Sequence, residues 1–183
     1  MMIQSISRLV FAAILLVIAG SQANADSKQV ARGKYLVTLG SCTDCHTPGH
    51  FLGKEDATRY LGGSDVGFDM PGLGVFVGPN LTPDKETGLG NWSARQIVTA
   101  LKTGALPDGR QLVPIMPWMA YANLTNSDAY AIAAYLKSLK PVKNQVPGPF
   151  GPSEKPTVFV MTIIPGSGMP PPPAPAPAPG QQK

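Results

Sequence analysis

The sequence predicts an all-α domain with long loops, and three observations support this fold class. Apolar residues recur at helical spacing in three segments, each opened by capping residues. The segments between them are rich in Gly and Pro, of which the chain has 20 each, and they lack strand alternation. The part of the chain that carries these features, residues 26–146, has the length of one domain.

The first helix is expected from Lys28 to Leu39. Asp26 and Ser27 are both good N-caps for it, and Gly40 is expected to end it. Its inner face carries three small or apolar residues, Val30, Gly33 and Val37.

The second helix is expected to begin at Ser93 and to stop at Gly104. Gln96 follows Ser93 at the spacing of a capping box, in which each side chain bonds to the backbone of the other residue. Ile97 and Leu101, four residues apart, mark its apolar face.

The third helix has the clearest pattern of the three. Thr125 and Asp128 open it at capping distance. Lys137 and Lys140 complement the helix dipole near its end, before Pro141. Its apolar positions recur at helical spacing: Ala129, Ile132, Ala133 and Leu136.

The N-terminus has the features of a cleaved export signal. Arg8 precedes an apolar run, residues 9–19, that is short for a bilayer span, and Ala23-Asn24-Ala25 is a small-x-small cleavage site. We therefore expect residues 1–25 to be removed and the mature protein to work in the periplasm. An uncleaved anchor stays an alternative, because the apolar run can be extended to about 18 residues.

The chain changes character from Pro147 onward. Residues 147–169 contain many Pro and Gly, but the apolar, β-branched stretch at 157–164 is expected to lie as an extended strap across the domain. Residues 170–183 form a Pro/Ala-rich tail of low complexity, which favours a disordered or extended chain. A spacer is the plainer interpretation of this tail, and a binding segment for a partner is the other.

The net charge of the chain is small. Removal of the leader takes one of the 15 Lys and Arg residues and lowers the formal charge from +4 to +3. Nucleic-acid binding favours clustered basic residues, so no nucleic acid is expected as a partner. A weakly charged surface suits the docking of protein partners.

Cys42-Thr43-Asp44-Cys45-His46 has the spacing C-x-x-C-H, the attachment sequence of a c-type haem. Two thiols one turn apart can add to the two vinyl groups of a porphyrin, and the imidazole that follows can bind iron from one face. The chain has no other Cys and only one other His. The motif therefore predicts one haem c, bound through Cys42 and Cys45, with His46 as an iron ligand.

Three other interpretations of the motif fit less well. A disulfide between the two thiols closes a loop too small to stabilise much and leaves His46 unexplained. A thioredoxin-like pair requires a preceding strand, for which the sequence has no pattern. A zinc site that adds His50 needs the adjacent Cys45 and His46 at two corners of one tetrahedron, where they are poorly placed.

An electron carrier needs a second axial ligand on the iron. His50 lies on the same side of the motif as His46, so a thioether is the better candidate, and it also raises the reduction potential. Met116 is flanked by prolines and apolar residues, a context that holds a ligand at a fixed distance in a dry crevice. Two other methionines stay open as alternatives: Met119 and Met70.

Together these residues resemble class I cytochrome c. The resemblance rests on the attachment motif, on Gly78-Pro79-Asn80-Leu81, on Met116-Pro117 and on residues 131–137 of the last helix. The longer run over residues 78–139 is similar to single cytochrome c modules in the haem subunits of bacterial alcohol, aldehyde and gluconate dehydrogenases. Those subunits typically carry three attachment motifs and this chain has one, which favours a stand-alone carrier of one haem.

The resemblance implies a class I cytochrome c fold, with three main helices and long loops around the haem. It implies that the first and last helices cross near Gly33, where the missing side chain permits close approach. Ile132 and Tyr135 are implied to pack at this crossing.

The resemblance also implies that the carbonyl of Pro79 accepts a hydrogen bond from Nδ1 of His46. Such a bond orients the imidazole and increases its donation to iron. By their chemistry, the Trp92 indole and the Arg110 guanidinium are candidates to bind the haem propionates. A core aromatic at a helix entry and a solvated charge are the plainer interpretations of these two residues.

These features predict a periplasmic electron-transfer protein of a respiratory chain, with no catalytic residues, that cycles one haem between Fe(III) and Fe(II). Its expected partners are redox proteins that dock transiently: a dehydrogenase or respiratory complex as donor, and a downstream acceptor. Membrane association is expected only through a partner or an uncleaved leader. Two alternatives stay open: a haem subunit tethered in a larger oxidoreductase complex, and an open-site haem protein with gas-binding or peroxidase-like activity.

Overall fold

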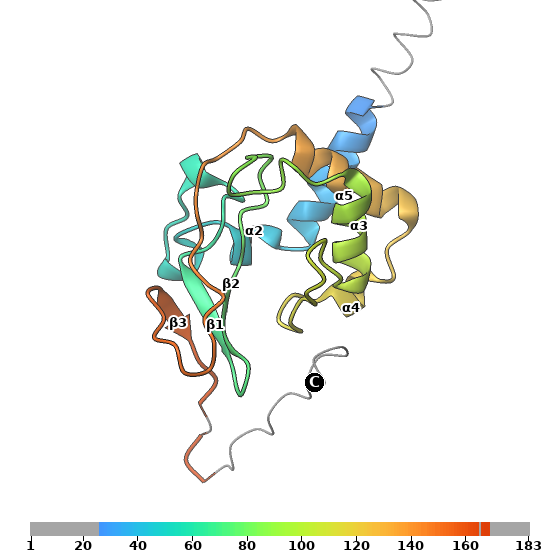
Figure 1. The fold of residues 1–183 in the computed structure, drawn as a ribbon. Helices are drawn as coiled ribbons and strands as arrows, with labels where there is room; N and C mark the ends of the chain where they lie inside the picture. Colours follow the sequence, from blue (N-terminus) through green and yellow to red (C-terminus); the bar gives the residue numbers. More distant parts are fainter. Residues whose placement is uncertain (1–25, 165, 169–183) are drawn as a thin grey trace, which may run out of the picture.

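The computed structural model describes residues 26–164 and 166–168, and it contains a helical half and a loop-rich half with a small sheet (Figure 1). The elements are, in chain order, a helix described over residues 26–39, α2 (Cys42–His46), the 3-10 helices η1 (His50–Leu52) and η2 (Ala57–Arg59), the strands β1 (Val66–Met70) and β2 (Gly74–Val77), the helices α3 (Ala94–Thr103), α4 (Trp118–Tyr121) and α5 (Asn126–Ser138), and β3 (Phe159–Met161). The short helix α2, which carries the attachment motif, lies between the sheet and the helices α3 and α5 in Figure 1.

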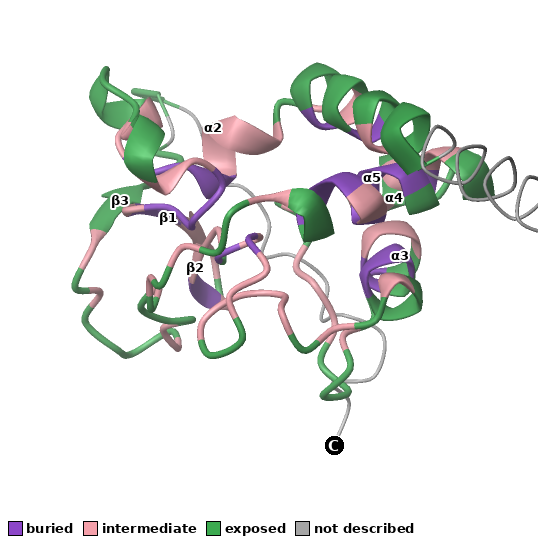
Figure 2. Ribbon diagram, turned by 90° about the horizontal axis from the view of Figure 1, so that it is seen from above, coloured by how far each residue is buried: buried purple, intermediate pink, exposed green. Residues whose placement is uncertain are grey.

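The helical half packs around an apolar core. Figure 2 shows the buried residues of α5 between the neighbouring helices. The core residues come mainly from the first helix, α3 and α5: Val37, Leu61, Ile97, Val98, Ala129, Ile132, Ala133, Tyr135 and Leu136. Among the described helices, none is both long and apolar enough to cross a membrane.

The predicted ends of α3 and the start of α5 are confirmed. Ser93 and Gln96 form the reciprocal capping box, and Gly104 closes α3 in the left-handed region at φ 72°. The Thr125 side chain accepts a hydrogen bond from the backbone N–H of Asp128. These ends were predictable because a cap depends on residues only three or four positions apart.

The start of the first helix differs from the prediction. Residues 26 and 27 are already helical, so Asp26 and Ser27 are not the N-caps that their residue types suggested. A capping preference is a weak signal, because Asp and Ser are also found within helices.

The first helix and α5 cross at Gly33. A Cβ atom there would lie 1.9 Å from the carbonyl oxygen of Ala131 and 2.7 Å from Cβ of Tyr135. No other residue has a side chain small enough for this contact, which is the close crossing that the resemblance implied. Ala131, rather than the expected Ile132, supplies the nearest atoms.

The prediction of an all-α domain omitted the small sheet. Its strand order is β2-β1-β3, with β1 antiparallel to β2 and parallel to β3, in a register that pairs Phe68 with Phe76 and with Met161. Phe150 pairs with Val75 on the other edge of β2. The strands have five, four and three residues, and Gly67 and Gly74 interrupt their pattern, so local sequence carries little strand signal.

The sheet also involves the segment that was expected to be an extended strap. Residues 159–161 of this segment form β3, which lies beside β1 although about 90 positions separate them. The predicted leader, residues 1–25, and the predicted tail, residues 170–183, lie outside the described residues.

Candidate haem-attachment site

The attachment motif forms a helix of its own. The first helix ends where Gly40 N–H donates to the carbonyl of Leu36 at 2.8 Å, and Ser41 then takes the left-handed region at φ 50° before α2 begins. The sharp turn separates the two helices. Within α2, Cys42 and Cys45 are three positions apart, so their thiols lie on one face of the turn.

Both thiols are free and half-buried. Burial is the main cause that raises the pKa of Cys42 to about 11, and it also raises the pKa of Cys45. Both therefore stay protonated at neutral pH and are weak nucleophiles in this state. Cys42 and Cys45 do not form a disulfide with each other in this structure.

His46 is buried, with 5% of its surface exposed, and its Nδ1 lies 2.8 Å from the carbonyl oxygen of Pro79. Burial lowers the pKa of His46 more than this hydrogen bond raises it, so the imidazole is neutral at pH 7. A carbonyl can only accept, and Nδ1 must therefore carry the proton. The other ring nitrogen, Nε2, then has a free lone pair, which is the form of imidazole that binds iron.

Gly78 is the reason that Pro79 can reach His46. A Cβ at Gly78 would lie 1.7 Å from the carbonyl oxygen of Cys45 and 3.3 Å from Nδ1 of His46. The backbone of this loop therefore lies directly against the motif helix. In the sequence Gly78 is recognisable only as part of a motif, because its steric role depends on a contact between residues far apart in the chain.

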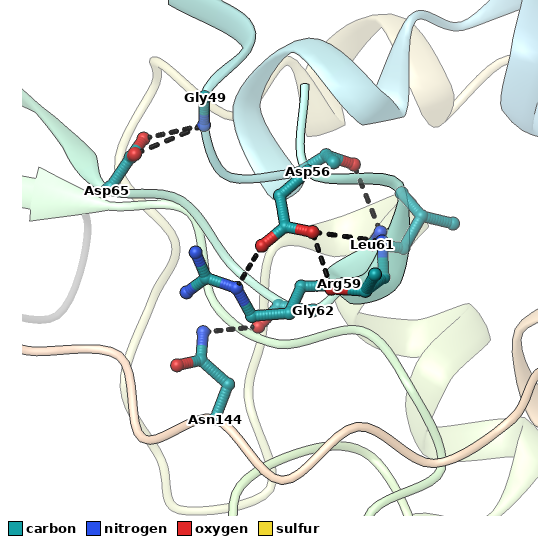
Figure 3. Close-up of polar contacts among 9 residues, drawn as sticks. Gly49, Asp56, Arg59, Leu61, Gly62, Asp65 and Asn144 are labelled. Atoms are coloured by element: carbon teal, nitrogen blue, oxygen red, sulfur yellow. Dashed lines mark hydrogen bonds and ion pairs between the residues drawn. The ribbon is translucent and has the colours of Figure 1, made fainter. Parts of the chain in front are cut away.

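Hydrogen bonds join the segment after the motif to the turn at residues 61–65. Both carboxylate oxygens of Asp65 lie 3.1 Å from the backbone nitrogen of Gly49 (Figure 3). The carbonyl of His46 accepts from Gly63 N–H at 2.8 Å, and Thr47 Oγ1 accepts from Leu61 N–H at 3.0 Å. The turn at residues 61–65 thus holds the backbone of His46 and of the residues directly after it.

Met116 lies in a tight turn that is anchored to the end of α3. Its N–H donates to the carbonyl of Val113 at 3.1 Å, and its own carbonyl accepts from Trp118 N–H at 2.8 Å. The Trp118 ring lies 2.9 Å from where a Cβ on Gly104 would be, and its indole N–H donates to the carbonyl of Leu112 at 3.2 Å. Trp118 is a second residue whose positioning role the sequence analysis missed.

The methionine candidates differ in exposure. Met116 is half-buried, whereas the rival Met119 is 54% exposed on α4. Met70 ends β1 and lines an open surface pocket with residues of the 151–160 segment. None of these observations tests iron ligation, so the order of the candidates stays a prediction.

Trp92 and Arg110 lie in different settings. Trp92 packs against the helical core, and its carbonyl accepts from Lys137 Nζ at 2.8 Å. The Arg110 guanidinium is exposed and pairs with Asp108 at 2.8 Å, a contact that lowers the pKa of that carboxyl. Their roles toward haem propionates also stay predictions.

The His50 side chain contacts Glu55 and Phe51. Its Nδ1 lies 2.7 Å from Glu55 Oε1, and its ring packs edge-on against Phe51. Within residues 26–164 and 166–168, no group of three or more Cys, His, Asp or Glu side chains is arranged to hold a metal ion. The zinc interpretation therefore has no support from this geometry.

The donor set fits a covalently attached haem. Two free thiols lie on one turn, and a neutral imidazole with an available Nε2 follows them directly. The structure brings together Cys42, Cys45, His46 and Pro79. These residues would hold the haem, Cys42 and Cys45 by covalent attachment and His46 through Nε2, with the Pro79 carbonyl as the acceptor that orients the imidazole.

Comparison with known proteins identifies the family. The family model described as Cytochrome c matches residues 30–140, which is more than half of the chain. The chain belongs to the cytochrome c family. The resemblance seen in the sequence is thereby confirmed, and membership implies a covalently bound haem c, in agreement with the two Cys at C-x-x-C-H spacing.

Several relatives are cytochrome subunits of dehydrogenases. This cytochrome c is 37% identical over 134 residues to the fructose dehydrogenase cytochrome subunit of Gluconobacter japonicus, an alignment that covers 70% of this chain and 26% of that protein. It is 32% identical over 127 residues to the alcohol dehydrogenase (quinone) cytochrome c subunit of Gluconobacter oxydans, with 69% and 25% covered. It is 32% identical over 135 residues to the gluconate 2-dehydrogenase cytochrome c subunit of Pantoea cypripedii, with 73% and 28% covered.

The chain thus spans about a quarter of the length of these relatives. All three are named as cytochrome subunits. The prediction of an electron carrier, and not a catalytic subunit, agrees with them.

Proposed function

We propose that this cytochrome c is a periplasmic electron carrier with one haem c, attached through Cys42 and Cys45 and ligated by His46 and Met116. The observation that carries the proposal is the buried, neutral imidazole of His46, which follows two free thiols and donates from Nδ1 to Pro79. When bound, haem c supplies one-electron exchange between Fe(III) and Fe(II).

The residues of the chain supply geometry and a low dielectric. Pro79 holds the tautomer of His46 that presents Nε2, and the buried side chains of Thr47 and Pro48 keep water from the region directly after the imidazole. The short turn at Met116, anchored by Trp118, supports a ligand held at fixed distance. Haem iron bound by both His46 and Met116 would have no position left for a substrate, which favours a carrier over a catalyst.

Absorption spectroscopy of the purified holoprotein tests the ligation. We expect a charge-transfer band from a thioether to ferric iron, lost in Met116→Ala and kept in Met119→Ala, which removes an exposed methionine from the neighbouring helix turn. A high-spin ferric spectrum of the unmutated protein would contradict the proposal and favour the open-site alternative.

The periplasmic location is supported by the leader sequence, residues 1–25, and by the relatives, since haem attachment to cytochromes of this kind takes place after export. N-terminal sequencing of the mature protein tests this, and we expect it to start at Asp26. A chain that keeps residues 1–25 would instead favour the anchored form.

We propose that the electron donor is a dehydrogenase, because the relatives are named as dehydrogenase cytochrome subunits. Arg110 and Trp92 are proposed to bind the haem propionates, for which Arg110 must exchange its present partner Asp108. Stopped-flow reduction of the oxidised cytochrome by candidate dehydrogenases tests the first point. Arg110→Ala, expected to change the reduction potential while Lys85→Ala does not, tests the second.

The same relatives favour one second candidate, a haem subunit tethered in a larger complex. Here the Pro/Ala-rich tail, residues 170–183, acts as the tether. Deletion of the tail is expected to abolish co-purification with a partner and to leave the haem spectrum intact. Elution of the full-length chain from gel filtration of cell extract as a monomer would instead support the free carrier.

A further inference from the structure

Asn80 is a buried polar residue directly after Pro79, with 2% of its surface exposed. Its Nδ2 donates to the carbonyl of Val142 at 2.7 Å and to Oγ1 of Thr87 at 3.0 Å. Its Oδ1 accepts from N–H of Thr82 at 2.9 Å and from Oγ1 of Thr82 at 2.7 Å. The amide therefore uses both donors and both acceptor lone pairs, so its position is fixed from several directions.

The partners of Asn80 tie the loop to the chain that leaves α5. Thr82, which is fully buried, accepts from Val142 N–H at 3.0 Å, so both backbone groups of Val142 are bonded to this loop. Oγ1 of Thr87 also accepts from Asn144 N–H at 3.0 Å. Residues 142 and 144 thus join a loop that lies about 60 positions earlier in the chain.

Asn144 also reaches the turn that holds the backbone of His46. Its Nδ2 donates to the carbonyl of Gly62 at 2.7 Å, a contact drawn in Figure 3. The next residue, Gly63, donates to the carbonyl of His46 at 2.8 Å. The same short segment after α5 is therefore bonded on one side to the neighbour of Pro79 and on the other to the turn beside His46.

We propose that Asn80, Thr87, Val142 and Asn144 form a polar clamp that positions the His46–Pro79 hydrogen bond, and that the clamp thereby helps to set the reduction potential of the haem. The planarity of the peptide bond links Asn80 to the Pro79 carbonyl. The Pro79 carbonyl and the Asn80 nitrogen belong to one rigid peptide unit, so a fixed Asn80 side chain restricts the direction of the carbonyl. Two flanking bonds, Leu81 N–H to Leu61 and Ser64 N–H to Gly78, both at 2.9 Å, restrict it further.

The clamp has a defined electronic consequence. A strong hydrogen bond from Nδ1 makes the imidazole a better donor, which stabilises Fe(III) relative to Fe(II). A loosened clamp weakens this bond, so the reduction potential rises. This inference rests on the proposed function, because the potential is a property of the haem-loaded protein.

The experiment uses holoprotein and a matched set of variants. Thr87→Val keeps the shape of the side chain and removes the hydroxyl that accepts from Asn80 and Asn144 and donates to Asp84, whereas Thr87→Ser keeps that hydroxyl. Asn144→Ala, at a half-buried residue, removes only the side-chain bond to Gly62 and is a second test if the first variant does not fold. Asn91→Ala is the control, since exposed Asn91 bonds only to the Lys85 carbonyl in the same loop.

Two quantities are measured: the reduction potential and the hydrogen-exchange rate of His46 Nδ1–H by NMR. We expect Thr87→Val and Asn144→Ala to raise the potential and to speed the exchange by about tenfold, the equivalent of one lost hydrogen bond. Thr87→Ser and Asn91→Ala are expected to match the unmutated protein in both quantities.

A merely structural role would lower the melting temperature of both variants and leave the potential and the exchange rate unmoved, which overturns the clamp. The spectrum of the unmutated protein separates this result from a failure of the proposed function. A protein without a His-ligated haem contradicts that function and with it the effect of the clamp on the potential. A protein with a normal spectrum whose variants do not shift contradicts the clamp alone.

Discussion

The helical half and the loop-rich half of this cytochrome c are stabilised in different ways. The first helix, α3 and α5 bury apolar side chains against one another. The loops over residues 60–90 and 142–150 are instead held by side-chain amides and hydroxyls and by glycines that permit close backbone contact. His46 lies between the two halves, so apolar packing brings the motif helix into place and polar contacts set the orientation of its imidazole.

The largest loss of stability is expected from a substitution in the helical half, where the first helix and α5 cross. Gly33→Ala places a methyl group 1.9 Å from the Ala131 carbonyl, and two packed helices cannot yield locally. We expect a loss of about 3 kcal/mol in the free energy of unfolding, despite the better helix propensity of Ala. Chemical denaturation measures it, with the exposed Lys34→Ala in the same helix as control. A variant more stable than the unmutated protein would show that propensity outweighs the contact.

The corresponding change in the loop-rich half is Gly78→Ala. The added Cβ would lie 1.7 Å from the Cys45 carbonyl, but a loop can move away more easily than a helix, so we expect a smaller loss of about 2 kcal/mol. This movement would carry the Pro79 carbonyl away from Nδ1 of His46, so we expect the reduction potential to rise. Gly33→Ala is expected to leave the potential unchanged. Gly53→Ala is the control, because it has open space and only a strained φ of 85°. Equal potentials for Gly78→Ala and the control contradict the prediction.

A purely local interaction should have a still smaller effect. Ser93→Ala removes the hydroxyl that caps α3 and its bonds with Gln96, while the backbone N–H of residue 93 can still donate to Gln96 Oε1. We expect a loss of about 1 kcal/mol with no change in the haem spectrum. Thermal unfolding measures the loss, with Ser127→Ala on the exposed surface of α5 as control. A changed spectrum would mean that α3 is coupled to the site more tightly than its position suggests.

The smallest effect is expected at the surface of the loop-rich half. Hydrogen bonds from Thr58 and then from Arg59 lower the pKa of the partly exposed Asp56 carboxyl to about 2 from its ordinary 3.8; Figure 3 shows the contact with Arg59. Because the folded pKa is depressed, the stabilisation is present above pH 4 and is lost as the pH falls toward 2. Asp56→Asn should lower the melting temperature slightly at pH 7 and should not differ from the unmutated protein near pH 2. A difference that persists at pH 2 contradicts a charge effect.

The quality of sequence-based prediction follows the same division. The ends of α3 and the start of α5 were correct because caps and apolar spacing are local. The sheet was missed because β3 pairs with a strand far away in the chain, and neither strand has a strong pattern of its own. The attachment motif was recognisable for the same reason as the caps, since its chemistry lies within five residues.

Residues that act over long distances were recognised only in part. The resemblance to cytochrome c implied the Pro79 contact, but it carried no information on why Pro79 can reach His46. That depends on Gly78, whose steric role is visible only beside the Cys45 carbonyl. Asn80 stood in a motif of the resemblance but had no role assigned to it, and Asn144 gave no signal, because an Asn in a turn has the same local pattern whether it is exposed or buried.

The sequence by itself determined the family, the attachment chemistry of Cys42, Cys45 and His46, and the local starts and ends of the helices, because each depends on a few adjacent residues. The tertiary structure decided how deeply His46 is buried, which glycines the fold requires, and which distant residues hold the loop around Pro79. These depend on burial and on contacts between segments up to about 100 positions apart, and no local pattern records them.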